Sequence, residues 1–381
     1  MNRLFKYLEH HGCNTMRVAL KETKGMGMGV YATQAIPAGQ VVLKIPLELW
    51  YPMSAGCAWT RLNDEEPKLC EDLIEFAKVN SRTNKTRSLL VGSASLIVHL
   101  LRELANKEAI ATPHLDMIPK TLHVPLFWSD DKLARLQASP IVNKVERRRK
   151  LVYELYSQVI GPNAGSAITP PNFAWGWSLI LSRAISNMKD QMPFAVVPML
   201  DFFNHASEGE KQSGFCTHWF DHEEKAFMVQ TLQAVEADDQ LFISYGDLGN
   251  SELLRLYGFC LDKNPWNRVR VVPEGVENLT IECNLNGSMS LDRLNNEIDT
   301  PTLNSDQIAR HLEYALSKYG TTVEADVIEL TQIREQKALF KPVQPEATPS
   351  TCEFQDIIDH EQALLARIGE KRSIAACLNA V

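Results

Sequence analysis

Two groups of strand-forming segments, separated by a long helical stretch, constrain the fold of this chain more than any other feature. Between Val18 and Pro46, β-forming residues surround a glycine-rich turn, and Pro37-Ala38-Gly39 marks a second turn before another strand. The strand pattern returns much later, in three segments separated by polar loops: Ala195–Met199, Ala226–Thr231 and Gln240–Tyr245. The sequence therefore predicts one β-unit that is split into two parts along the chain.

The stretch between the two β-parts has helical periodicity. Leu96, Leu100 and Leu104 recur at four-residue intervals, and short breaks contain proline. We expect residues 1–50 and 171–270 to form the two parts of the β-fold, residues 51–170 a helical insertion, and residues 271–381 a helical C-terminal domain. The fold class that follows is α+β.

Two helices have recognisable start signals. Asn172 is the expected N-cap of a helix whose core face carries four apolar residues: Phe173, Trp177, Ile180 and Ala184. Asn304 or Ser305 is the expected N-cap of a later helix that ends near Gly320.

The bulk properties favour an intracellular globular protein. No stretch approaches the roughly 20 apolar residues that cross a bilayer, and the N-terminus lacks the apolar core of a signal peptide. We therefore expect no membrane partner and a cytoplasmic or nuclear location.

Cysteine spacing and charge exclude two classes of site. The 8 cysteines form no Cys-x-x-Cys pair and no Cys/His cluster at zinc-ligand spacing, so we expect reduced thiols and no metal. The net charge of -8 disfavours broad nucleic-acid binding but is compatible with a lysine-bearing protein substrate. The basic run Lys144–Lys150 is expected to be a solvated helix face.

Taken singly, the residues that could carry chemistry have ordinary structural explanations. Gly27-Met28-Gly29 suits a tight turn, and the segment Asp201–His205 suits a loop with side chains that cap backbone groups. Tyr245-Gly246 suits the end of a strand, and Arg183 suits a helix surface. None of them indicates a function alone.

The order and spacing of these residues change that interpretation. The chain carries KGMGMGVYATQAIPAGQVVLKIP at residues 24–46, LDMIP at 115–119, FWS at 127–129, SRAIS at 182–186, VPMLDFFNH at 197–205 and ISYGDLGNSELLRLYGF at 243–259. Together they resemble the SET-domain protein methyltransferases of the Rubisco large-subunit methyltransferase type. That group includes fungal ribosomal-protein lysine methyltransferases and the actin histidine methyltransferase. The resemblance implies a SET β-fold with a helical insertion and a helical C-terminal substrate-binding domain.

The resemblance also implies a binding site for S-adenosylmethionine. It assigns cofactor contacts to seven residues: Met26, Gly27, Met28, Arg183, Asn204, His205 and Phe259. Backbone groups near a glycine-rich turn approach a ligand closely, and a guanidinium binds a carboxylate in a bidentate fork, so both suit an amino-acid-like cofactor tail. Phe259 matches an aromatic residue that lies against the adenine.

The acceptor side follows from the same resemblance. Tyr245 matches the catalytic tyrosine of the family, at the meeting point of the amine and the methyl donor, and Tyr257 matches a wall of the lysine channel. The remaining substrate-side positions are Arg183, Ile185, Asn187 and Asp201. An apolar Ile185 suits the alkyl stem of lysine, whereas histidine would favour a polar partner that fixes its tautomer.

The sequence therefore predicts a protein-lysine N-methyltransferase that acts on a non-histone protein, with a ribosomal protein as the favoured target, and we expect a monomer. Two alternatives remain. A protein-histidine methyltransferase shares the cofactor site and differs in the acceptor pocket. A non-catalytic binding module keeps the fold, but the joint presence of Asn204, His205 and Tyr245 argues against it.

Overall fold

The computed structural model describes residues 2–23, 25–106, 112–163, 167–185, 194–206, 214–276, 279–293, 303–339 and 348–381. The chain forms two compact units. The first comprises Met1–Leu122 and Lys150–Gly246, and the second comprises His123–Arg149 and Asp247–Val381. Asn187 lies outside the described residues.

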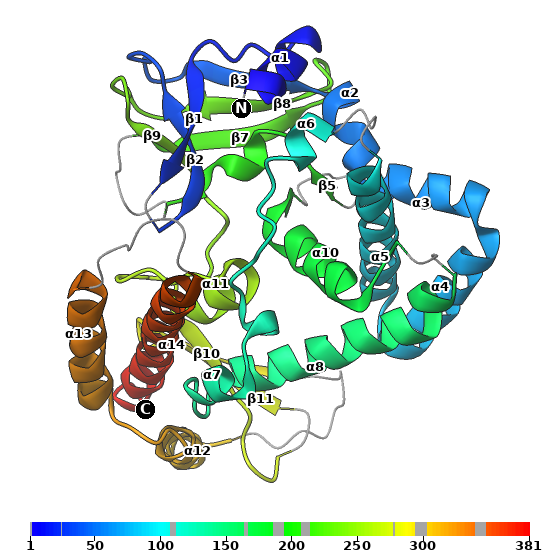
Figure 1. The fold of residues 1–381 in the computed structure, drawn as a ribbon. Helices are drawn as coiled ribbons and strands as arrows, with labels where there is room; N and C mark the ends of the chain where they lie inside the picture. Colours follow the sequence, from blue (N-terminus) through cyan, green and yellow to red (C-terminus); the bar gives the residue numbers. More distant parts are fainter. Residues whose placement is uncertain are drawn as a thin grey trace. The chain divides into compact units, whose positions relative to one another are not determined.

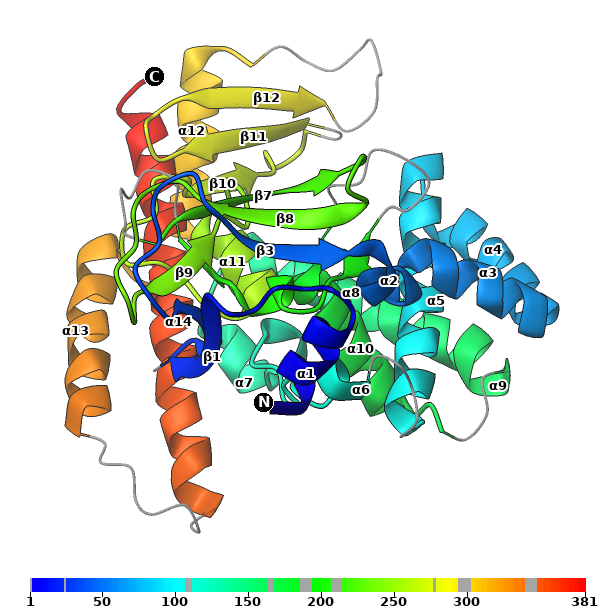
Figure 2. The same ribbon diagram turned by 90° about the horizontal axis from the view of Figure 1, so that it is seen from above.

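Two small sheets of the first unit join strands that lie far apart in the sequence (Figure 1). One has the order β1-β2-β9-β6, with β1 at Val18–Thr23, β2 at Gly27–Ala32, β9 at Gln240–Ile243 and β6 at Asn204–His205. The other has the order β3-β8-β7, with β3 at Val41–Pro46, β8 at Ala226–Thr231 and β7 at Cys216–Asp221 (Figure 2). A β-unit split along the chain is therefore confirmed.

Pairing within these sheets determines where the two β-parts meet. β2 runs antiparallel to β9, with Val30 opposite Leu241, whereas β6 runs parallel to β9, with His205 opposite Ile243. The strands bury a common apolar core that includes Val30, Leu43 and Phe203. Burial of each such side chain contributes about 1.5–3 kcal/mol, so this core stabilises the long-range pairing.

The remaining elements of the first unit are mostly helical. They are α1 (Asn2–His10), α2 (Leu47–Trp50), α3 (Ala55–Glu65), α4 (Pro67–Asn80), α5 (Asn84–Ala105), α6 (Thr112–Leu115), α9 (Gly161–Asn163), α10 (Pro170–Arg183), and the strand pair β4 (Ala184–Ile185) and β5 (Ala195–Val196). α8 (Pro140–Leu155) crosses the boundary between the units and continues into a π-helical turn, Tyr156–Ile160.

The start of α10 differs from the sequence prediction. Its N-cap is Thr169, whose side chain accepts a hydrogen bond from the backbone N–H of Asn172, while Asn172 accepts one from the N–H of Thr169. Asn172 is therefore the third helical residue of a reciprocal capping box rather than the cap itself. Phe173, Trp177 and Ile180 are buried as predicted, but Ala184 lies in β4.

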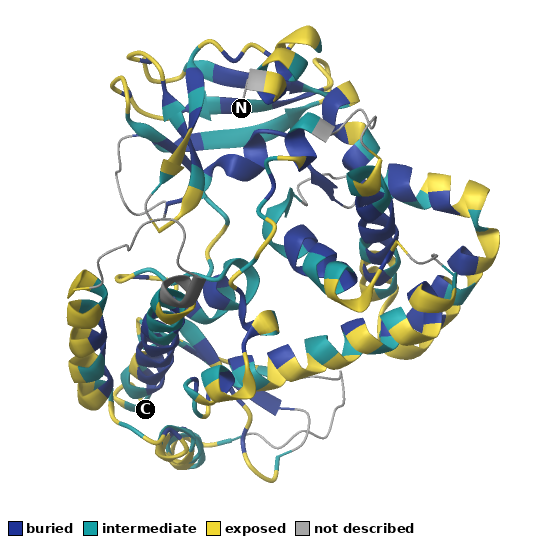
Figure 3. Ribbon diagram, in the orientation of Figure 1, coloured by how far each residue is buried: buried dark blue, intermediate teal, exposed yellow. Residues whose placement is uncertain are grey.

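Among the described residues, one helix is long and apolar enough to span a membrane by length and hydropathy alone, contrary to the sequence analysis. This helix is α5, with a mean hydropathy of 1.4 over its most apolar 18 residues, of which 56% is buried inside the protein. Leu96, Ile97 and Leu100 of α5 are completely buried, and Figure 3 shows the helix mostly buried. A helix in the core of a globular protein can reach the same length and hydropathy, so these two values do not make α5 a membrane span.

The second unit consists of helices and one sheet. Its helices are α7 (Asp130–Ala134), the first part of α8, α11 (Asn250–Tyr257), α12 (Ser305–Ser317), α13 (Val323–Leu339) and α14 (Thr348–Leu378). The expected cap at Asn304 is confirmed, because its side chain accepts a hydrogen bond from Gln307. A three-stranded antiparallel sheet was not expected and comprises β10 (Arg268–Val271), β11 (Leu279–Asn284) and β12 (Met289–Arg293).

The basic run of α8 is not simply a solvated face. Arg149 donates from its guanidinium to the backbone carbonyls of Pro125, Leu126 and Trp128 and pairs with Asp130. The guanidinium therefore stabilises the turn that precedes α7. All eight cysteines are free thiols, and six of them are buried.

Candidate active site

The glycine-rich turn between β1 and β2 leaves its backbone open to solvent. Gly25 and Gly27 have φ angles of +76° and +73°, which glycine adopts without strain. Met26 and Gly27 are exposed, and Met28 is half-buried. This turn can therefore offer backbone N–H and C=O groups to a ligand.

Gly29 is required for a different reason, its closeness to neighbouring side chains. A Cβ added there would lie 2.5 Å from Nε2 of Gln240, 2.6 Å from Oγ1 of Thr23 and 3.1 Å from Nδ2 of Asn204. Only a glycine lets these three polar groups converge on β2. The sequence analysis noted this glycine as part of a turn but gave no sign of the crowding.

Asn204 and His205 lie on β6, next to β9 and within reach of β2. Asn204 Nδ2 donates to the carbonyl oxygen of Met28 at 3.3 Å. His205 Nδ1 accepts a hydrogen bond from the backbone N–H of Tyr245 at 3.1 Å, and the two rings stack with centroids 5.1 Å apart. The structure thus brings together four of the predicted site residues, Met28, Asn204, His205 and Tyr245.

His205 is held in its neutral form by its surroundings. Burial lowers the pKa of its imidazole below the ordinary value of 6.5. A neutral ring can accept the hydrogen bond from Tyr245 at Nδ1, whereas a protonated ring cannot. The neutral state therefore supports the observed orientation of the two rings.

The hydroxyl of Tyr245 is fixed against the backbone. It donates to the carbonyl oxygen of Phe203 at 2.7 Å, and its side chain is half-buried at the end of β9. A phenol that donates in this way still has acceptor lone pairs, and its oxygen occupies a fixed position. It is suited to orient or polarise a group placed next to it.

A second polar cluster is centred on Asp201, three residues before Asn204. Arg183, at the end of α10, donates from Nη1 to the backbone carbonyl of Asp201 at 2.6 Å and lies 3.6 Å from its carboxylate. Nε2 of His114 lies 3.0 Å from each carboxylate oxygen of Asp201. The Asp201 and His114 side chains have no exposed surface, while Arg183 keeps 19%.

This cluster leaves part of the Arg183 guanidinium available. Its Nε is buried and has no hydrogen-bond partner among the described residues. A buried donor without an acceptor is unfavourable, so the position favours a ligand with an acceptor group. His114 was not predicted, because it stands one residue before the LDMIP segment and pairs with a residue 87 positions away.

The remaining predicted residues fall into three groups. Ile185 lies on β4, opposite Ala195, and packs against the core of the first unit. Asn187 lies outside the described residues. Tyr257 and Phe259 belong to the second unit, where their ring centroids are 6.2 Å apart and burial raises the pKa of Tyr257.

Gly258 fixes the chain between those two aromatic residues. It ends α11 in the left-handed conformation, with φ at +83°. A Cβ at this position would lie 2.5 Å from the carbonyl oxygen of His123. Both the conformation and the close approach require glycine.

Comparisons with known proteins agree with this arrangement. The family model described as "SET domain" matches residues 27–246. The chain is 24% identical over 274 residues to the ribulose-1,5 bisphosphate carboxylase/oxygenase large subunit N-methyltransferase of Pisum sativum, covering 67% of this chain and 50% of that protein. It is 23% identical over 287 residues to the actin-histidine N-methyltransferase of Gallus gallus, covering 70% of this chain and 44% of that protein. The chain thus spans about half the length of these relatives.

Solved structures share the fold. The SET domain of LSMT bound to lysine and AdoHcy superposes with a TM-score of 0.68 at 18% identity, covering 100% of this chain and 90% of that one. The structure of Rubisco LSMT bound to AdoMet gives 0.67 at 19% identity, with the same coverage. The α+β fold class is therefore confirmed.

Proposed function

The chain belongs to the SET-domain family, and from this premise we propose that it is an S-adenosylmethionine-dependent protein methyltransferase whose acceptor is a lysine side chain. The observation that carries the proposal is the convergence of Met28, Asn204, His205 and Tyr245 through β2, β6 and β9. Relatives named as protein N-methyltransferases and similar structures that hold AdoMet or AdoHcy support it.

The residues of the first unit fit an amino-acid-like methyl donor. The exposed turn at Met26 and Gly27 would hold its polar groups, with Met28, Asn204 and His205 beside it. The unpartnered Nε of Arg183 would meet its carboxylate. From the sequence resemblance we also propose that Phe259 lies against the adenine. When bound, S-adenosylmethionine supplies a methyl group on a positively charged sulfur.

The acceptor amine must be uncharged when it reacts. At an ordinary lysine pKa near 10.4, about one side chain in 2,500 is neutral at pH 7, a penalty of roughly 4.6 kcal/mol. Burial of the lysine in a channel removes much of this penalty, because a charged amine is disfavoured away from water. Tyr245, fixed by its bond to Phe203, would orient the amine, and positioning in a dry site supplies a large part of the rate.

The proposed acceptor side consists of Ile185, Asn187, Asp201, Arg183 and Tyr257. The half-buried Ile185 suits the aliphatic part of a lysine. Asp201 is held by Arg183 and His114, and its buried carboxylate fixes the guanidinium of Arg183 at the proposed site.

For the substrate itself we propose a ribosomal protein, methylated by a monomeric enzyme in the cytoplasm or nucleus. Ribosomal proteins are rich in exposed lysine, and the net charge of -8 complements a basic protein.

The experiment is methylation of a whole-cell extract by the purified chain with S-adenosylmethionine labelled on its methyl group. We expect a labelled protein whose modified residue is methyllysine by mass spectrometry, with the label lost in Tyr245→Phe. Tyr153→Phe, which alters a tyrosine that is 69% exposed, is the matched control and should keep activity. Absence of labelling with every extract and failure to bind S-adenosylmethionine would remove the proposal.

A second candidate is methylation of histidine, favoured by the relatives named as actin-histidine N-methyltransferases. The same experiment separates the two, because methylhistidine in the labelled peptide replaces the lysine assignment.

A further inference from the structure

The helical insertion of the first unit contains a cavity, open to solvent on one side, that the proposed methyl transfer does not use. Its volume is about 400 Å³, and its walls come from α3, α4 and α5. This volume lies within the range of about 300–1,000 Å³ that is common for small-molecule sites.

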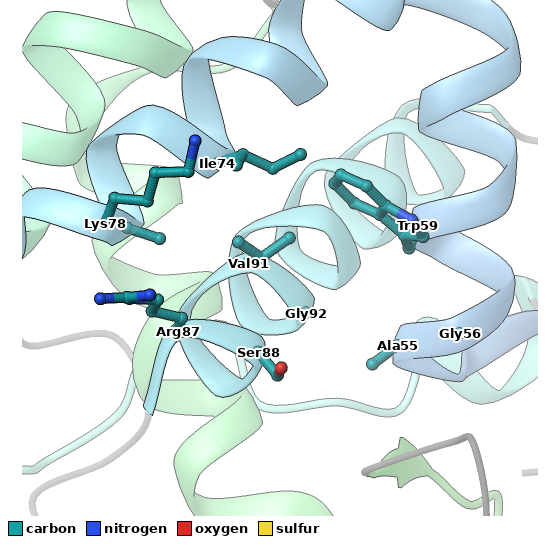
Figure 4. A pocket seen from close by; sticks show the side chains of 10 residues that line it. Ala55, Gly56, Trp59, Ile74, Lys78, Arg87, Ser88, Val91 and Gly92 are labelled. Atoms are coloured by element: carbon teal, nitrogen blue, oxygen red, sulfur yellow. The ribbon is translucent and has the colours of Figure 1, made fainter. Parts of the chain in front are cut away.

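The two ends of the cavity differ in chemistry. Figure 4 shows Lys78 and Arg87 on one side and Trp59 on the other, with Ile74 and Val91 between them. Ile74 is 38% exposed, so the apolar end is in contact with water in the absence of a ligand. An occupant with an apolar body and a charged head would match both ends.

Arg87 identifies the sign of that charge. Among the described residues no carboxylate lies within ion-pair distance of its guanidinium, and Nη1 reaches only the side-chain oxygen of Asn84, at 3.2 Å. Its Nε is buried and has no acceptor in the same part of the chain. A half-buried guanidinium beside an apolar wall is stabilised when an anion accepts from it.

Lys78 adds a second cation at the same end. Its ammonium group pairs with Glu75 at 2.6 Å, but both side chains are more than half exposed. An exposed pair of this kind is worth little, so Lys78 can turn toward an anion in the cavity at small cost.

The walls favour a small molecule over a peptide strand. All three are helices, so the cavity offers no free strand edge to an extended peptide. We propose that this cavity is a binding site for a small organic acid with an apolar chain or ring, whose anionic group contacts Arg87 and Lys78 and whose apolar part packs on Trp59, Ile74 and Val91. The site does not depend on the proposed function.

Calorimetric titration with decanoate tests the proposal, with decan-1-ol as the uncharged probe of equal chain length. We expect saturable binding of one decanoate per chain and binding of decan-1-ol at least tenfold weaker, because the bond to a charged group is lost. Arg87→Leu should weaken decanoate binding by a similar factor, and Arg87→Lys should recover part of it. Glu75→Gln, which frees Lys78, should strengthen it.

Lys85→Leu is the matched control, because it removes an exposed cation from the first turn of the same helix without touching the cavity. It should leave binding unchanged. Ser88→Phe, at the exposed rim, should block the cavity while the guanidinium remains in place. Equal binding of decanoate and decan-1-ol, equal loss in Arg87→Leu and Lys85→Leu, or no saturable decanoate binding would overturn the proposal.

Discussion

Nε2 of His114 lies 3.0 Å from both carboxylate oxygens of Asp201, and neither side chain reaches solvent. A carboxylate can only accept, so Nε2 of His114 carries the hydrogen. The histidine and Arg183 hold Asp201 from two elements, α6 and α10, and the negative charge therefore has a fixed position beside Asn204.

Replacement of His114 by leucine should lower the free energy of unfolding by about 1–3 kcal/mol, because a buried carboxylate loses one of its donors. His114→Gln, whose amide can still donate, should lose less. Denaturant unfolding of the three proteins measures the difference. Equal stability of the leucine variant and the parent chain would show that the contact does not support Asp201.

Tyr245→Phe should reduce methyl transfer about 100- to 1,000-fold, since it removes a fixed hydroxyl next to the reacting groups. The variant also loses the hydrogen bond to Phe203, which costs about 1 kcal/mol of stability. Turnover under saturating donor, together with calorimetric binding of S-adenosylmethionine, separates catalysis from cofactor affinity. Undiminished turnover would remove Tyr245 from the reaction.

Gly29→Ala should harm the donor site more than Gly27→Ala. The first places a methyl group 2.5 Å from Gln240 Nε2 and 2.6 Å from Thr23 Oγ1, and forced packing of this kind costs about 1–3 kcal/mol. The second meets no atom within 4 Å and only strains a φ of +73°, at about 1–2 kcal/mol. Donor affinity of the two variants should therefore differ, and the opposite order would contradict the crowding argument.

The buried His99 should make the stability of the first unit sensitive to acid. Burial, with the nearby charge of Arg61, lowers the pKa of His99 from 6.5 to about 4, and the residue is 8% exposed. As the pH falls, His99 is therefore protonated in the unfolded chain at a higher pH than in the folded chain. The free energy of unfolding should drop by up to about 3 kcal/mol between pH 6.5 and 4 from this residue.

The measurement is unfolding at pH 7 and at pH 4.5. In His99→Gln the drop should shrink, whereas His222→Gln, a change at an exposed histidine, should leave it as in the parent chain. A drop of the same size in both variants would assign the acid sensitivity to other groups.

Patterns within a few neighbouring residues correctly predicted those elements that depend on short-range interactions. The β8 pattern at Ala226–Thr231 and the cap at Asn304 agree with the structure, because strand alternation and capping act over a few residues. At the start of α10 the same reasoning assigned the N-cap to Asn172, whereas the N-cap in the structure is Thr169. Both residues are polar and three positions apart, so the sequence alone does not distinguish the two members of the capping box.

Features that depend on distant contacts were not predictable in this way. Arg149 was assigned to a solvated face although it binds three backbone carbonyls that lie 21 to 24 positions earlier in the chain. By contrast, β11 and β12 form a local hairpin at Asn286-Gly287, a turn signal that the sequence analysis overlooked. The site residues came from the resemblance of separated motifs, whereas the contact between His114 and Asp201 spans 87 positions without a local pattern.

The pairing of β2 with β9 and of β3 with β8 has a consequence for synthesis of the chain on the ribosome. The first strands emerge early, but their partners at residues 226–243 are made some 180 to 210 residues later. Until then β2 and β3 have unpaired edges, which attract other chains. Protection of the nascent chain by a chaperone during this interval should therefore govern the yield of folded protein.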